Sequence, residues 1–151
     1  DDLAQIRMLL EPPAIAMVAQ NIPEEAFADL TKLADSCLRA AEREDLGEYL
    51  SDDRDFHALL LTHTGNPQLV DLATSLRRRT RLYGIAALAR GGRLPESARE
   101  HHEILDMLRE GNGPAAEELM RRHIGHARKS WATGAEEAAI AAAREGAPKG
   151  A

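Results

Sequence analysis

The hydrophobic residues of this chain recur every three or four positions, and no segment alternates apolar and polar residues as a half-buried strand does. This spacing predicts amphipathic helices over about residues 2–20, 23–41, 46–62, 67–89, 95–109 and 114–131, and a helical stretch in the tail to near residue 144. Aromatic residues make up only 3% of the chain. The pattern therefore predicts an all-α fold of about six or seven helices.

Prolines and glycines mark the expected helix boundaries. Pro12 and Pro13 interrupt the first helical pattern, so we expect a kink or a restart there. Gly65 can end the third helix in the left-handed conformation, and Asn66 can cap the fourth helix with Pro67 in its first turn. No linker divides the chain, and its 151 residues are enough for one core.

Composition narrows the classes of function. The net charge is −6, from 25 acidic and 19 basic residues, which makes this chain by itself a poor candidate for binding DNA or an anionic membrane. Cys37 is the only cysteine, so no internal disulfide can form, and we expect it to be a small buried residue. No signal peptide or membrane-spanning run is evident, which predicts a cytoplasmic location and no membrane partner.

Four ionisable residues lie on the apolar faces of three predicted helices: Asp53, His57, His101 and His123. An unpaired charge there costs several kcal/mol by rough estimate, and a shared cation removes that cost. Asp53 and His57 are four residues apart and can bind one cation from a single helix. The alternatives are a helix-surface ion pair for these two residues and a hydrogen-bonded network without metal for the whole group.

The remaining polar candidates divide into inward-facing and outward-facing residues. Arg7 lies on the apolar stripe of the first helix, where a guanidinium needs an anion, either a ligand or a structural salt bridge. Arg77 and Arg81 can reach the same interior, although only a subset of the arginine run from Arg77 to Arg79 can point inward. The other histidines are expected near the surface or outside the ligand set, and two glutamates are expected to face solvent: His63, His102, His126, Glu100 and Glu103.

Five motifs in succession resemble the FadR C-terminal (FCD) domain, the effector-binding half of many GntR-family transcriptional regulators. Residues 7–11 resemble its R-x-x-L-E pattern, residues 53–57 its D-x-x-F-H motif, and residues 64–67 its small-Gly-Asn-Pro turn. Residues 100–105 match E-H-x-x-I-L, and Gly111-Asn112 followed by Ala116, Met120, His123 and Ile124 matches its final motif. The resemblance covers about residues 2–131, and we expect an FCD-like effector-binding domain over 1–133 and a helical or flexible tail over 134–151.

The resemblance implies an antiparallel helical bundle with a central cavity and a divalent cation, often zinc or nickel. It implies Asp53, His57, His101 and His123 as the metal ligands, with Arg7 lining the cavity and Asn66 near it. It also implies a small organic acid as effector, a homodimer, and DNA binding only through an N-terminal winged helix-turn-helix domain, which nothing in this chain resembles. Pro12-Pro13 departs from the usual sequence of the first helix.

These observations favour the sensing domain of a transcriptional regulator, in which metal and acid together control an attached DNA-binding domain. One alternative is a metal-dependent enzyme acting on a small carboxylate, with Glu100 or Glu103 as the nearest candidate base. Another is a metal-free helical dimerisation module, since helical bundles serve many functions.

Overall fold

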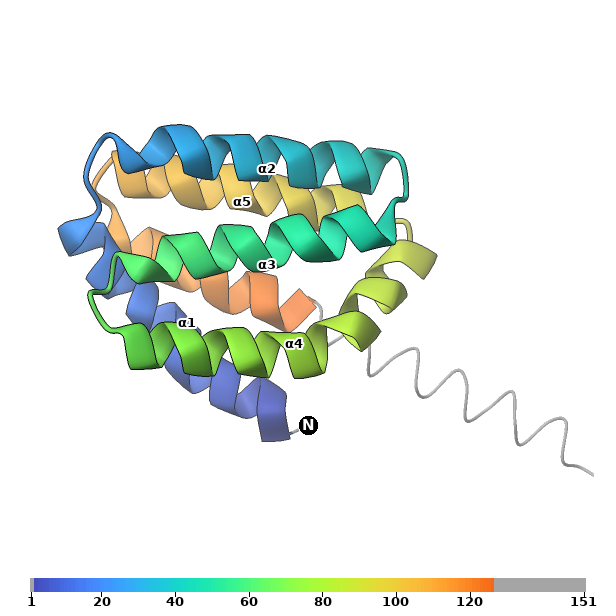
Figure 1. Cartoon of the computed structure of the whole chain (residues 1–151), viewed down its shortest axis with the longest axis horizontal. Helices are drawn as coiled ribbons and strands as arrows, with labels where there is room; N and C mark the ends of the chain where they lie inside the picture. Colours follow the sequence, from blue (N-terminus) through green and yellow to red (C-terminus); the bar gives the residue numbers. More distant parts are fainter. Residues whose placement is uncertain (1, 127–151) are drawn as a thin grey trace, which may run out of the picture.

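The computed structural model describes residues 2–126, apart from the side chains of residues 81–83, and this part of the chain is helical without strands. The helices are α1 (Asp2–Asn21), α2 (Ala26–Glu42), α3 (Leu46–Thr62), α4 (Pro67–Arg90) and α5 (Leu94–Arg109), followed by a helix over 113–126. Short turns join neighbouring helices into a bundle (Figure 1). The all-α prediction is confirmed, whereas the predicted tail helix lies outside the described residues.

Local sequence signals set several helix boundaries as expected. The side chain of Asn66 accepts a hydrogen bond from the backbone N–H of Leu69 and caps α4, with Pro67 in the first turn. Gly65 has a φ of +72°, the left-handed conformation expected after α3. By contrast, the sequence predicted that α2 starts at about Pro23, but it begins at Ala26. Residues 24 and 25 form a turn instead, and the side chain of Glu25 does not cap the helix.

The predicted restart at Pro12 and Pro13 is wrong, because α1 continues through both prolines. Each proline removes one backbone donor from the helix. Pro12 itself is buried, and the next turn places Ala14 and Ile15 in the core, at 1% and 0% exposure. Tertiary packing on both sides of the prolines therefore holds a helix that the local sequence disfavours.

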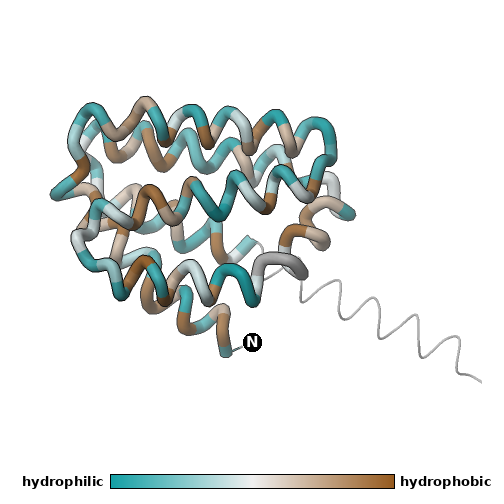
Figure 2. Tube along the Cα trace, viewed as in Figure 1, coloured by the Kyte–Doolittle hydropathy of each residue, from teal (hydrophilic) through white to brown (hydrophobic). Residues whose placement is uncertain are grey.

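The core consists of two neighbouring apolar clusters. Each helix carries both apolar and polar positions (Figure 2), and the larger cluster joins all five labelled helices and the helix over 113–126, with Ala73 as its fully buried residue from α4. The smaller one includes Cys37, Tyr49, Ile85, Leu88 and Leu94. The last part of α4 turns toward the start of α5 (Figure 1), which brings Ile85 and Leu88 into this cluster. Cys37 is fully buried, as the sequence predicted.

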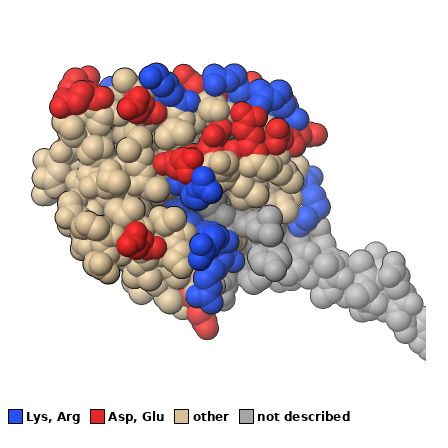
Figure 3. All heavy atoms as spheres, viewed as in Figure 1, with Lys and Arg blue, Asp and Glu red and all other residues tan. Residues whose placement is uncertain are grey.

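Charged side chains lie mostly on the surface, and acidic and basic groups interleave along the edge formed by α2 and α5 (Figure 3). Ion pairs such as Lys32 with Asp29 and Arg109 with Asp106 are exposed, so each contributes little stability. None of the helices in the described part of the chain has the length and apolar character needed to cross a membrane.

Replacing Gly65 with Ala is expected to lower the free energy of unfolding by about 1 kcal/mol, because an L side chain is strained at its positive φ. Gly47→Ala is the control, since Gly47 lies inside α3 and an added Cβ meets only Asp45 Oδ1 at 3.6 Å. That control is expected to be neutral or stabilising. Urea unfolding of both variants measures the difference, and equal stabilities would contradict this account of the turn.

Candidate metal centre and the buried charges beside it

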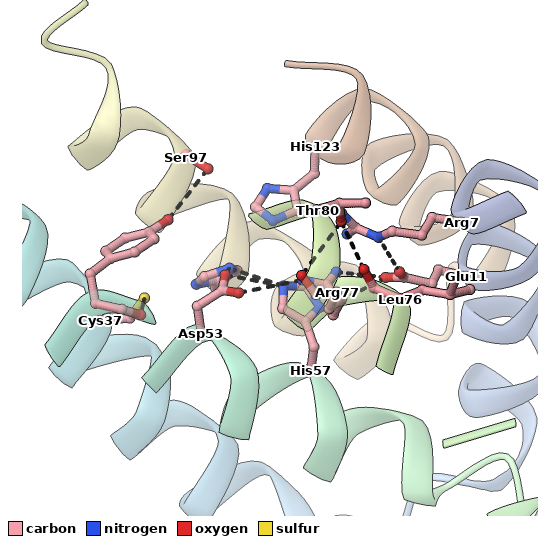
Figure 4. Close-up of polar contacts among 12 residues, drawn as sticks. Arg7, Glu11, Cys37, Asp53, His57, Leu76, Arg77, Thr80, Ser97 and His123 are labelled. Carbon is pink, nitrogen blue, oxygen red and sulfur yellow. Dashed lines mark hydrogen bonds and ion pairs between the residues drawn. The ribbon is translucent and has the colours of Figure 1, made fainter. Parts of the chain in front are cut away.

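Three helices bring the four predicted ligands together. Asp53 and His57 come from α3, His101 from α5 and His123 from the helix over 113–126. Each residue is at most 2% exposed, and one donor atom from each lies within 4.8 Å of all the others. Figure 4 shows Asp53, His57 and His123 directed toward a common point. The structure therefore brings together the four residues that the sequence analysis grouped, and their role as metal ligands stays a prediction.

The donor atoms are close enough to share one ion. Nε2 of His57 lies 3.2 Å from Nε2 of His101, and Oδ1 of Asp53 lies 3.2 Å from His101 Nε2 and 3.5 Å from His57 Nε2. Burial lowers the pKa of His57 well below its usual value, and Arg77 lowers it further, although Asp53 opposes both effects. His57 is thus held neutral, the form that binds metal. Three imidazoles and one carboxylate fit a divalent transition metal such as zinc or nickel.

Glu100 contacts the ring nitrogen of His123 that points away from the other three candidate ligands. The prediction that Glu100 faces solvent is wrong. Its side chain is buried, with Oε2 at 2.7 Å from His123 Nδ1 and Oε1 at 3.0 Å from His126 Nδ1. A proton on His123 Nδ1 donated to this carboxylate leaves Nε2 as the basic nitrogen, a common arrangement behind a metal-binding imidazole. Burial raises the pKa of Glu100, while His126 and His101 oppose that rise. Glu103, by contrast, is exposed as predicted.

Two buried guanidinium groups share a carboxylate whose role the sequence analysis missed. Glu11 accepts hydrogen bonds from Arg7 Nε through Oε1 at 2.6 Å and from Arg77 Nε through Oε2 at 2.8 Å. Arg77 Nη2 also lies 2.6 Å from Oε2, within ion-pair distance. Arg77 Nη1 also lies 3.4 Å from Oδ2 of Asp53. Arg7 Nη1 donates to Thr80 Oγ1 at 3.0 Å. A continuous series of ion pairs therefore runs from α1 through Arg77 on α4 to Asp53, one of the four candidate ligands (Figure 4).

The structure shows Arg7 in a buried salt bridge with Glu11, which is one of the two partners considered for it, and an organic-acid ligand stays a prediction. Burial alone would raise the pKa of Glu11, but Arg77, Arg7 and the hydrogen bond from Arg7 outweigh it and lower that pKa to about 2. The signal was available in the sequence, because Arg7 and Glu11 are four residues apart on the buried side of one helix. Of the arginine run, Arg77 points inward while Arg78 and Arg79 are exposed.

The other candidates lie away from the four ligands. Asn66 is exposed and its side chain caps α4, while the side chain of Arg81 lies outside the described part of the structure. His102 is half-buried, and its Nε2 lies 2.7 Å from Oδ1 of Asp35, so its ring is paired with Asp35 instead of with the four candidate ligands. His63 is partly buried beyond the end of α3. None of these side chains has a described contact with the four donors.

Wild-type protein is expected to be more stable than Glu11→Gln at neutral pH by roughly 2–3 kcal/mol, because the depressed pKa of Glu11 stabilises its ionised form in the folded state. This advantage is present above the ordinary pKa of about 4.5 and is lost as the pH falls toward the folded value of about 2. Urea unfolding at several pH values between these limits measures it.

The matched control is Glu117→Gln, which removes a carboxylate from a partly exposed pair with Arg121. We expect it to change stability by less than about 1 kcal/mol at each pH. A stability difference between wild type and Glu11→Gln that stays constant across this pH range would contradict the assigned role of the Glu11 carboxylate.

Comparison with known proteins agrees with the fold and the motifs. Residues 2–126 match the model of the FCD domain. The structure is similar to that of Escherichia coli McbR/YncC, with a TM-score of 0.77 and 20% identity over 88% of this chain and 67% of that one. It is also similar to Streptococcus agalactiae GntR, with a TM-score of 0.72 and 29% identity over 85% of this chain and 57% of that one. A search of curated proteins found no match.

The chain thus spans about two thirds of the first of these solved proteins and somewhat more than half of the second. FCD domains belong to transcription regulators, which are not enzymes, so the alternative of a metal-dependent enzyme is not supported. The family resemblance expected from the five motifs is confirmed over the whole described part. The chain therefore belongs to the FCD family, the effector-binding domains of GntR-type regulators.

Proposed function

We propose that this domain holds one divalent cation with Asp53, His57, His101 and His123 and senses a small organic acid beside it. The observation that carries the proposal is the placement of four buried donors, from three helices, within 4.8 Å of one another. Zinc is the first candidate and nickel the second, since both accept imidazole and carboxylate ligands. A bound cation supplies positive charge and open coordination positions, which attract a carboxylate.

The residues around the donors support an anionic effector. Arg77 is buried beside Asp53, and the buried Arg7 is joined to Arg77 through Glu11. Guanidinium groups bind carboxylates through paired hydrogen bonds. Asn66 and Arg81 stay predictions as further effector-binding residues. The acid acts on the domain only to the extent that it binds one arrangement of the helices better than another. In a longer protein that carries a winged helix-turn-helix domain, this difference would control DNA binding.

The cation is expected to stabilise the folded domain, because the unfolded chain does not hold these four donors together. Free metal at about 1000 times its Kd contributes about 4 kcal/mol, or roughly 8–16 °C in Tm for a domain of this size. Elemental analysis and thermal unfolding with and without a chelator check this expectation. About one metal ion per chain and a fall in Tm on chelation support the metal site. An unchanged Tm and no metal would favour the metal-free dimerisation module.

Substitution of one proposed ligand at a time, compared with substitution of a histidine outside the site, distinguishes loss of a metal ligand from a general effect of losing a histidine. His101→Ala and His123→Ala are expected to weaken metal binding by more than about 100-fold, beyond the loss typical of residues that only support a ligand. His102→Ala is the matched control, because His102 neighbours His101 in sequence but contacts Asp35. Competition with a coloured chelator measures the affinity. Full metal occupancy in both ligand variants would contradict the assignment.

A small hydroxy acid or sugar acid is expected to raise the Tm of the metal-loaded domain more than that of the chelated domain. The reason is that the cation adds two positive charges to a buried site. A thermal-shift panel of such acids, with matching alcohols as uncharged controls, tests the effector class. Equal shifts with and without metal would contradict metal-assisted binding. Homodimerisation, which the family resemblance also implied, stays a prediction that sedimentation velocity tests.

A further inference from the structure

The contact between Glu11 and the two arginines has the form of a bound carboxylate ligand. Its two oxygens are divided between two guanidinium groups that come from different helices, one oxygen to Arg7 and the other to Arg77. All three side chains are at most 4% exposed. Figure 4 shows Arg7 and Glu11 reaching toward Arg77 at the side of the histidine cluster. A small organic acid bound to these arginines would make the same contacts through its own carboxylate.

The arginine pair also has donor capacity that Glu11 does not use. Arg7 Nη2 is buried and makes no hydrogen bond with the described residues, whereas Nε and Nη1 of the same group donate to Glu11 and Thr80. A buried guanidinium N–H without an acceptor carries a free-energy penalty, which a ligand oxygen would relieve. This unsatisfied donor lies on the same guanidinium that already holds a carboxylate, so it marks a place where an anion would be stabilised.

Charge balance shows why the site without a bound cation does not simply add a further carboxylate. The positive charges of Arg7 and Arg77 are matched by the negative charges of Glu11 and Asp53. In the chelated protein, an added anion therefore meets a neutral group that already contains two carboxylates, and repulsion between buried like charges is strong. If Glu11 leaves the pair, two guanidinium groups face one carboxylate, and an external anion restores the balance.

We propose that the Arg7–Arg77 pair is a carboxylate-binding site that the chain fills with its own Glu11, and that an organic acid binds there by displacing Glu11. Glu11 is then a built-in competitor that sets the affinity for the effector. The link to an effector rests on the proposed function, whereas the carboxylate site itself does not depend on the metal.

Displacement of Glu11 has a consequence for α1. Glu11 is only 1% exposed, so its carboxylate reaches water only if α1 shifts or rotates against α4. The same exchange breaks the described ion pair between α1 and α4 that Glu11 makes with Arg77. An acid at this site therefore loosens the first helix of the domain, which is the helix closest in sequence to any domain that precedes it.

Chemical rescue with acetate tests the site in the chelated protein. Glu11→Ala removes the competitor and leaves room for an external carboxylate between the two guanidinium groups. Acetate is expected to raise the Tm of this variant in a saturable manner, with at least ~10-fold higher apparent affinity than for wild type, since displacing a buried ion pair costs more than ~1.4 kcal/mol. Chloride at matched ionic strength and the surface variant Glu117→Ala are the controls, and neither should reproduce the rescue.

Two further variants keep the test decisive. Glu11→Ala with Arg77→Met removes one charge of each sign, and acetate is expected to lose its stabilising effect. If Glu11→Ala alone does not fold, even with acetate, Glu11→Gln replaces it, because the amide keeps the shape and removes the negative charge. Glu11→Gln is expected to bind acetate at least ~10-fold more tightly than wild type, as measured by calorimetry.

The outcomes separate this proposal from the metal site. Acetate rescue of chelated Glu11→Ala supports the carboxylate site whether or not the wild-type protein holds a metal, whereas the absence of metal from wild-type protein purified without a chelator overturns only the proposed cation. Metal binding with no gain in acetate affinity in Glu11→Ala or Glu11→Gln overturns the competitor role and leaves Glu11 as a structural ion pair only.

Discussion

The interior of this bundle depends on keeping buried charges paired. An isolated carboxylate or guanidinium costs several kcal/mol in a helix core, yet α1, α3 and α4 bury two of each. Glu11 joins Arg7 to Arg77, and Arg77 joins Glu11 to Asp53. Loss of Glu11 removes the described carboxylate partner of Arg7 and one of the two described carboxylate partners of Arg77. These side chains therefore help to specify how α1 lies against α4.

The same pairing connects two sites of different chemistry. One oxygen of Asp53 faces the histidines and the other faces Arg77, so the proposed cation and the arginine pair share a carboxylate. Behind the histidines, Glu100 holds the ring of His123 and extends the network toward His126. Binding of the proposed cation would therefore change the charge that Arg77 faces at Asp53. Because Arg77 also pairs with Glu11, this change would act on the contact between α4 and α1. This gives a physical route from a buried ligand to the first helix of the domain.

Sequence periodicity predicted most of the helices and the inward-facing positions of Asp53, His57, His101 and His123, because both depend on spacing along one helix. The bounds of α3 agree with the expected range, and α4 begins at Pro67 where Asn66 caps it. Ion pairs between side chains of different helices were harder to predict. Glu11 contacts Arg77 from 66 residues away, and a glutamate is ordinarily expected at the surface. Glu100 lies four residues before the buried Ile104, so its place on the inner face was present in the pattern. Pro12 and Pro13 show the opposite case, in which packing overrides a local signal.

X-ray absorption at the zinc and nickel edges of the purified chain tests the central claim most directly, because it reports the atoms around the ion. The account predicts one ion bound by about three imidazole nitrogens and a carboxylate oxygen, with metal–nitrogen distances near ~2.0–2.1 Å for zinc. It also predicts that the imidazole signal falls in His101→Ala. A spectrum of an ion surrounded by water oxygens alone, or one unchanged by that substitution, would contradict a metal centre at Asp53, His57, His101 and His123.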